Sequence, residues 1–264
     1  MADTKLSALS LVPAAKGDPF NDRFYAYLAE GATDADKQVA LRPVDLFLQM
    51  NRKWSWRWTD VIEPNAVAQS WSGDGAQGND QNVDVVNRPG VIAVQCGTDP
   101  DGWSMAWSGN NYAFRRGGGA QRFVSVFKTP DTLSTATDRY ALYCGLKREY
   151  GTAAPGEMIG IRYRDDWNGG KWELVCRDNA AIAAADSGIS VTADAWYWVE
   201  ININAGATSV SVSINGVTVG PVTTQIPLAE HFFCFIDVVK TSGTNNRAAF
   251  LDAGGWFLHL ATAR

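Results

Sequence analysis

The amino-acid sequence predicts an all-β protein. Short segments in which apolar and polar residues alternate recur from about residue 83 to the end, and helical periodicity is nearly absent. Gly, Asn, Asp and Pro separate these segments where turns are expected. Many short strands with one apolar face are typical of a sandwich of two antiparallel sheets or of a jelly roll.

The alternation defines twelve expected strands in this part of the chain. They are Val83–Val86, Gly90–Cys96, Trp103–Trp107, Gln121–Lys128, Arg139–Leu146, Met158–Arg164, Lys171–Arg177, Trp196–Asn204, Ser209–Ile214, Val217–Val219, Phe232–Val239 and Ala248–Leu260, the last with a break at Gly254-Gly255. Asn215-Gly216 supplies the pair of positive φ angles that a two-residue type I′ turn requires.

The segment GIRYRDDWNGGKW, residues 160–172, combines two aspartates, two arginines and two tryptophans. Apolar and charged residues alternate on both sides of Asn168-Gly169-Gly170, which has the composition of a turn. We therefore interpret the segment as a β-hairpin whose aspartates, Asp165 and Asp166, lie in water.

The first fifty residues have a different pattern. A strand, a polar loop (GATDADK) and a second strand precede Pro43, which can open a short helical turn. So small a unit cannot bury its own apolar side chains. We expect these to pack on another copy, on the larger domain or on a partner, and they are Phe24, Tyr25, Tyr27, Leu41 and Phe47.

Residues 51–82 are interpreted as a tryptophan-rich junction followed by a Gly/Asn-rich linker. Trp54, Trp56 and Trp58 recur at period two, which favours a strand that buries its indoles against the sandwich or a neighbouring subunit. A ligand-stacking platform is the alternative. The predicted organisation is an attachment and oligomerisation segment (1–50), this junction (51–82) and a jelly-roll domain (83–264).

Composition excludes several classes of partner. The net charge of -5 and the pI near 5.1 argue against nucleic-acid binding. No apolar stretch of about 18 residues predicts a membrane span, and no secretion signal is recognised, so we expect a soluble protein made in the cytoplasm. Four scattered cysteines, Cys96, Cys144, Cys176 and Cys234, are expected to be buried reduced thiols, with zinc ligands or disulfides as the alternatives.

Residues 83–264 contain several landmarks in order, most notably the strand WYWVEININ, the hairpin INGV and the run SGTNNRAAFLD. With these landmarks, the region resembles the concanavalin A-like (lectin/glucanase) jelly-roll domains of bacteriophage structural and fibre proteins. Separately, the start MADTKLSALSL, followed by FYAYLAEG and KQVALRPVDLF, resembles the N-terminal attachment segment of phage tail and fibre proteins. The longer loop GATDADK and Arg42-Pro43 depart from that pattern.

The resemblance implies two kinds of chemistry that can be sought in the residues. Glucanases of this fold carry a Glu-x-Asp-x-x-Glu strand, and this sequence has none. HExxH, GxSxG and phosphate-loop motifs are also absent, and His231 and His259 lie among apolar residues as structural histidines would. We therefore predict a protein that is not an enzyme and needs no cofactor.

Calcium is an alternative, because lectins of this fold order their loops with it. Candidate ligands in the hairpin are Asp165, Asp166 and Asn168, and a second set is Asp74, Asn79, Asp80 and Asp84. Both sets are interpreted first as solvated turn residues. Sugar binding by stacking needs only exposed aromatic rings, and the candidates are Trp103, Trp107, Tyr112, Trp167 and Trp198.

The sequence thus predicts a structural protein of a tailed-phage virion, on the fibre or the head. Its N-terminus would dock to other capsid or tail proteins, and a homotrimer is expected by analogy with fibres. Two further hypotheses are a lectin module that binds glycans of the host surface and a polysaccharide-degrading enzyme.

Overall fold

The computed structural model describes residues 25–26, 39–40, 54–60, 72–75, 79–85, 88–107, 119–148, 156–227 and 232–260. The chain divides into two compact units, Met1–Arg52 and Lys53–Arg264.

In the first unit, β1 (Tyr25–Ala26) pairs antiparallel with β2 (Val39–Ala40). This agrees with the expected strand, loop and strand, since Tyr25 and Ala40 are register partners. The helical turn expected after Pro43 lies outside the described residues, as do Phe24, Tyr27, Leu41 and Phe47.

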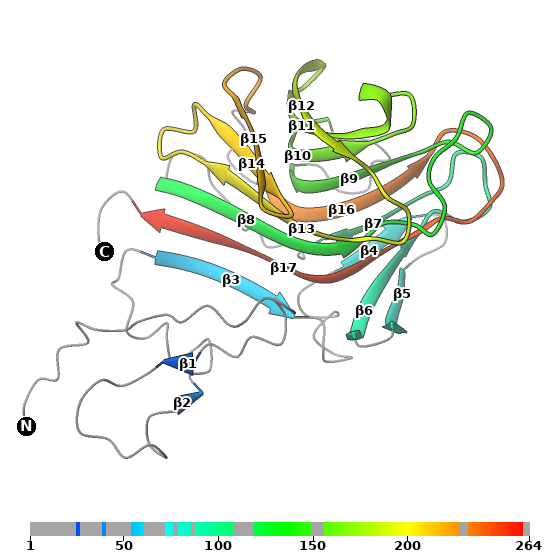
Figure 1. The fold of residues 1–264 in the computed structure, drawn as a ribbon, viewed down its shortest axis with the longest axis horizontal. Coiled ribbons are helices and arrows are strands. Elements are labelled where there is room, and N and C mark those ends of the chain that lie inside the picture. The colour runs from blue at the N-terminus through cyan, green and yellow to red at the C-terminus, as the bar shows by residue number, and fades with distance from the viewer. Residues whose placement is uncertain are drawn as a thin grey trace, which may run out of the picture. The chain divides into compact units, whose positions relative to one another are not determined.

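The second unit consists of two antiparallel sheets, as the sequence predicts (Figure 1). One sheet has seven strands in the spatial order β12-β11-β10-β9-β16-β7-β4. In chain order these strands are β4 (Ser72–Gly75), β7 (Trp103–Trp107), β9 (Tyr140–Lys147), β10 (Met158–Tyr163), β11 (Lys171–Asp178), β12 (Ala181–Ser190) and β16 (Phe233–Lys240). A single 3-10 turn, η1 (Asn168–Gly170), joins β10 to β11.

The other sheet has the order β15-β14-β13-β8-β17-β6-β5, with β3 paired to β17 outside that path. Its strands are β3 (Trp54–Asp60), β5 (Asn79–Val85), β6 (Arg88–Gln95), β8 (Gly119–Lys128), β13 (Trp196–Ile203), β14 (Val210–Ile214), β15 (Val217–Val222) and β17 (Ala248–Leu260). The turn between β14 and β15 has φ of 48° at Asn215 and 86° at Gly216, the positive pair that the sequence predicts.

The main core lies between the two sheets and follows from the alternation of each strand. In β13, Tyr197, Val199, Ile201 and Ile203 are buried, while the residues between them are not. Complete burial of one such aliphatic side chain contributes about 1.5–3 kcal/mol. Trp172 is at the centre of an aromatic group, and its ring centroid lies 5.2 Å from that of Tyr197 and 5.8 Å from that of Phe127.

The seven-stranded sheet is also apolar on its other face. All residues of β9 and β16 are buried, so these central strands show little polar alternation. We call the apolar residues of this second face the outer cluster. It comprises Met105, Ala141, Tyr143, Met158, Val175, Phe233, Phe235 and Val239.

Three features of the fold differ from the sequence prediction. β12 was not predicted, because its alanines and glycine have low strand propensity and pairing with β11 decides the structure. β4 lies in a sheet, although its residues fall in the segment interpreted as a linker, whereas β3 is the strand expected at Trp54, Trp56 and Trp58 and pairs with β17. β17 has no break at Gly254-Gly255, because β8 and β3 pair with it on both sides there.

Candidate functional site

The hairpin between β10 and β11 places Trp167 against two cations. The guanidinium carbons of Arg162 and Arg164 lie 4.3 Å and 4.1 Å from the centroid of the Trp167 ring. Tyr143 lies at 6.0 Å, centroid to centroid. Because two guanidinium groups already contact this ring, at most one of its faces is open to a sugar.

Asp165 is held by protein groups, so the prediction that it lies in water is wrong. The Arg139 side chain donates two hydrogen bonds of 3.0 Å, one to each carboxylate oxygen, and the Ser134 hydroxyl donates a third of 2.6 Å. Burial acts to raise the pKa of Asp165, but the bonds from Arg139 and Ser134 outweigh it and lower that pKa. Arg139 lies just before β9, too far along the chain for the hairpin sequence to reveal the contact.

The same contacts bear on the calcium hypothesis. Asp166 pairs with Arg164 at 2.5 Å and with Arg139 at 3.3 Å, and the Asn168 amide donates to Asp186 at 2.6 Å. Each hairpin candidate for the ion is therefore committed to another group. In the part of the chain that the structure describes, no group of three or more His, Cys, Asp or Glu could hold a metal.

The second candidate calcium set does not lie in a turn, which corrects its interpretation as solvated turn residues. Asp74 belongs to β4, and Asn79, Asp80 and Asp84 belong to β5, where pairing with β7 and β6 extends the backbone. Their side chains are outside the described part of the structure. Calcium binding stays an untested alternative to the predicted absence of a cofactor.

Three of the predicted stacking residues have described side chains, and these lie on both sheets. Trp103 and Trp167 pack against the outer cluster of the seven-stranded sheet. Trp198 is half-buried in the other sheet, where its indole N–H donates to Glu200 at 2.8 Å. Tyr112 and the side chain of Trp107 lie outside the described residues, as do His231 and the side chains of His259, Trp54, Trp56 and Trp58.

Two carboxylates occupy one row across the outer face of the seven-stranded sheet. Asp237 is opposite Tyr143, Tyr143 is opposite Arg162, and Arg162 is opposite Glu173. Three strand spacings separate the two acids by about 14 Å, whereas the paired carboxylates of glycosidases lie about 5–9.5 Å apart. Both acids also form ion pairs, Glu173 with Arg162 at 2.8 Å and Asp237 with Lys147 at 2.7 Å.

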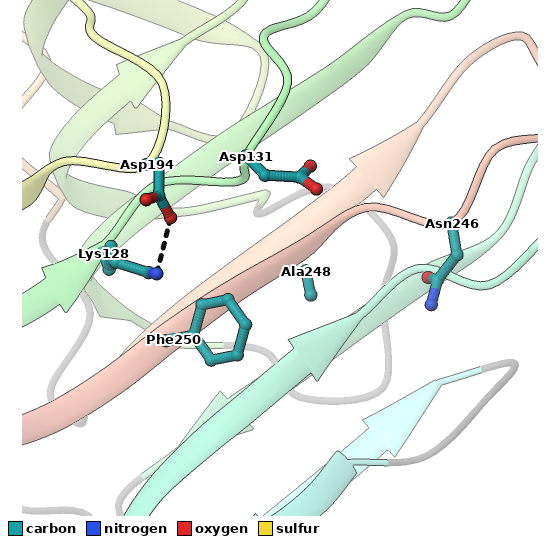
Figure 2. A pocket seen from close by; sticks show the side chains of 6 residues that line it. All are labelled: Lys128, Asp131, Asp194, Asn246, Ala248 and Phe250. Carbon is teal, nitrogen blue, oxygen red and sulfur yellow. Dashed lines mark hydrogen bonds and ion pairs between the residues drawn. The ribbon is translucent and has the colours of Figure 1, made fainter. Parts of the chain in front are cut away.

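A pocket of about 400 Å³ lies beside the end of β8 and the start of β17 (Figure 2). Its lining combines one aromatic ring with charged and amide groups. The lining residues are Lys128, Asp131, Asp194, Asn246, Ala248 and Phe250.

The pocket is built around Lys128 and Phe250, which are register partners on β8 and β17. The ammonium nitrogen of Lys128 lies 2.5 Å from Asp194 Oδ1 and 4.9 Å from the centroid of the Phe250 ring. In Figure 2, Asp131 is drawn beside Asp194, and its side chain is 81% exposed. Its carboxylate oxygen lies 3.9 Å from a guanidinium nitrogen of Arg247. An exposed carboxylate, an ammonium group and a ring therefore converge on one opening.

The SGTNNR loop, residues 242–247, positions Asn246 in this lining. The Asn246 side chain accepts from the Gly97 N–H at 2.8 Å and donates to Gln95 at 2.6 Å. Behind it, Asp138 accepts hydrogen bonds from Asn245 and Arg247. These bonds lower the pKa of Asp138, although burial acts to raise it.

Gly243 allows the close approach of this loop to Asp138. Its φ is 87°, and a Cβ on it would lie 2.1 Å from Asp138 Oδ1. In the sequence, SGTNNR was only a landmark of the family resemblance and had no predicted role. The pocket itself was missed, because its residues come from separate segments and form no local motif.

Residues 87–252 match the family model described as SO2946-like, C-terminal domain. The chain belongs to this family. No curated protein matches the sequence.

Solved structures place the SO2946-like chain in the concanavalin A-like fold. A protein of unknown function, SO2946 from Shewanella oneidensis MR-1, superimposes with a TM-score of 0.61 at 11% identity, covering 85% of this chain and 97% of that one. The carbohydrate recognition domain of Emp46p, in its potassium-bound form, superimposes with a TM-score of 0.53 at 8% identity, covering 77% of this chain and 96% of that one.

A prokaryotic β-1,3-1,4-glucanase (lichenase) derived from a mouse hindgut metagenome gives a TM-score of 0.51 at 12% identity, with coverages of 76% and 98%. At such identities the likeness shows the fold alone. The predicted jelly roll of the SO2946-like chain is thereby confirmed. Its described residues include no helix long and apolar enough to cross a membrane.

Proposed function

We propose that this protein is a non-enzymatic, glycan-binding jelly-roll protein of a tailed-phage virion. The observation that carries the glycan-binding part is the pocket of Figure 2, in a fold shared with a carbohydrate recognition domain. Its N-terminal segment would dock to capsid or tail proteins, and the jelly roll would project outward. This second part is supported by the N-terminal resemblance and by the separate first unit.

The chemistry of the pocket suits a neutral sugar. Sugar rings present apolar C–H groups that pack on aromatic side chains, and hydroxyl groups that hydrogen-bond to carboxylates and amides. Phe250 supplies the ring, and Asp131 and Asn246 supply polar groups in the same lining. Lys128 and Asp194 neutralise each other, so the pocket does not demand a charged ligand.

A matched pair of substitutions tests the site. Asp131→Ala removes an exposed acceptor, and we expect glycan affinity to fall about tenfold, the loss of one charged hydrogen bond. Asp101→Ala removes an exposed aspartate outside the pocket and should leave affinity unchanged. A glycan array with and without calcium identifies the ligand, and titration calorimetry then measures both variants.

Two results would count against the proposal. If the wild-type protein binds no glycan above background, with and without calcium, the proposed glycan-binding function is ruled out. Equal affinity of the wild-type protein and Asp131→Ala would leave glycan binding in place but move it away from this pocket.

The non-enzymatic part has its own test. The separation of Asp237 from Glu173, and the partners of each, support binding without hydrolysis. We expect no new reducing ends when the protein is incubated with host polysaccharide. Their release would favour the polysaccharide-degrading alternative.

A further inference from the structure

β12 is the terminal strand of the seven-stranded sheet, with β11 as its neighbour. One row of its backbone N–H and C=O groups therefore faces away from the sheet. Unless an edge of this kind is protected, it can pair with another chain.

The other terminal strands have protective features. β15 contains Pro221, which cannot donate to a neighbouring strand, and β5 has two register shifts. β4 has four residues, too few for a long template, and β3 carries Arg57 and Asp60. Each feature is a known way to prevent edge-to-edge association.

β12 lacks these features in its first half. Ala181–Ala185 contains no charge and no proline, and it follows β11 in unbroken register from Ala181 to Asp186. Among the described residues, the exposed large hydrophobic side chains are Ile182, at 44%, and Val217, at 52%. Val217 belongs to β15, which lies beside β12 (Figure 1). Both exposed apolar groups thus belong to terminal strands at the same edge of the sandwich.

We propose that β12 is an interface between two copies of this chain, which pair antiparallel through Ala181–Ala185 and extend the seven-stranded sheet across a two-fold axis. A pairing centred on Ala183 keeps each residue on its own face and places Ile182 opposite Ala184 of the partner subunit. The two Asp186 carboxylates are then about 20 Å apart, so no like charges meet.

A second copy fits this edge better than a charged partner does. The segment offers backbone groups and alanine, which a strand of identical composition complements and which give a charged partner no counter-charge. The contact uses residues of the second unit alone, so it would join two monomers, or two trimers if the N-terminal segment trimerises. Because a single strand pair is small beside a standard interface of about 800 Å² per partner, we expect the association to depend on concentration.

The test uses the full chain and a double substitution, Ile182→Lys with Ala184→Lys. Both positions are exposed, so lysine should be tolerated in the folded monomer while it blocks the edge. The control, Ala136→Lys with Ala205→Lys, adds the same charge at two exposed alanines outside β12. Mass is measured by sedimentation over a range of concentrations, and folding by circular dichroism and thermal unfolding.

The expected result is an even number of subunits for the wild-type protein and the control, and half that number for the β12 variant at unchanged circular dichroism. A wild-type monomer or trimer at the highest concentration would overturn the proposal, and so would a β12 variant that keeps the wild-type mass. If the variant unfolds, the single substitution Ala184→Lys is measured by the same criterion.

Discussion

At the scale of single residues, Lys147 and Asp237 form an ion pair whose side chains are both 0% exposed. The ammonium nitrogen of Lys147 lies 4.8 Å from the centroid of the Phe235 ring, and Phe235 belongs to the apolar outer cluster. Removal of one partner leaves a buried charge without a counter-charge. Replacement of both by apolar residues does not, so the two kinds of change have different expected costs.

We expect Asp237→Asn to lower the free energy of unfolding by about 3–5 kcal/mol. The double substitution Lys147→Met with Asp237→Leu should be much closer to the wild-type protein. Urea unfolding of the three proteins measures the difference. A double variant as unstable as Asp237→Asn would show that the pair itself supplies the stability.

The same carboxyl predicts a pH dependence. Burial raises the pKa of Asp237 to about 6 against the opposing effect of Lys147, while the ordinary value is 3.8. Between these values the native protein holds more protons than the unfolded chain, so this group's contribution to stability falls as pH rises from about 4 to about 6. Unfolding free energies measured across this window should lose that slope in the double variant.

Asp138 and Asp165 contribute a pH dependence of stability with the opposite sign. Their lowered pKa values mean that their stabilising contribution is present above the ordinary value of 3.8 and is lost as pH falls below it. The effect of Asp237 therefore appears above pH 3.8, and the effect of Asp138 and Asp165 appears below it.

The prediction for Asp237 can be contradicted. If the fall in stability between about pH 4 and about pH 6 persists in the double variant, a group other than Asp237 causes it.

At the scale of elements, the SGTNNR loop connects backbone geometry to the pocket. Gly243→Ala forces a positive φ on alanine and overlaps with Asp138, so the loop must move and displace Asn246. We expect lower stability and weaker glycan binding. Gly216→Ala is the matched control: its φ is also positive, but a Cβ there meets nothing within 4 Å. It should cost about 1 kcal/mol or more by strain alone and leave binding unchanged.

Thermal unfolding and calorimetric titration of both glycine variants make this comparison. Unchanged binding by a folded Gly243→Ala protein would contradict the role given to the loop. Equal loss of binding in both variants would instead indicate a general effect of destabilisation.

Elements also show how far the sequence could predict this fold. β13, β14 and their Asn215-Gly216 turn were predictable because alternation and turn chemistry are local. β12 was not, since its alanines give no period and only its pairing with β11 makes it a strand. The candidate site follows the same rule. Hairpin residues could be named, but the contact of Asp165 with Arg139 depends on tertiary structure.

At the scale of the whole molecule, the division after Arg52 predicts separable tasks. Both sheets lie in the second unit, so we expect a protein that lacks residues 1–50 to fold and bind glycans with unchanged affinity. The same protein should no longer be incorporated into phage particles. Immunolabelling of virions and a glycan titration measure the two properties. Labelled virions that carry the truncated protein would contradict the docking role of the N-terminal segment.

The four cysteines are free and buried, as predicted, and burial raises the pKa of Cys144 and Cys176 to about 12. Cys144, Cys176 and Cys234 belong to the seven-stranded sheet, and Cys96 directly follows β6 of the other sheet. Because a thiol reacts as its thiolate and only where a reagent can reach it, alkylation of the native protein must wait for the sandwich to open. The four cysteines are therefore internal probes of unfolding. The order in which their sulfurs are alkylated would show which of the two sheets becomes accessible to the reagent first.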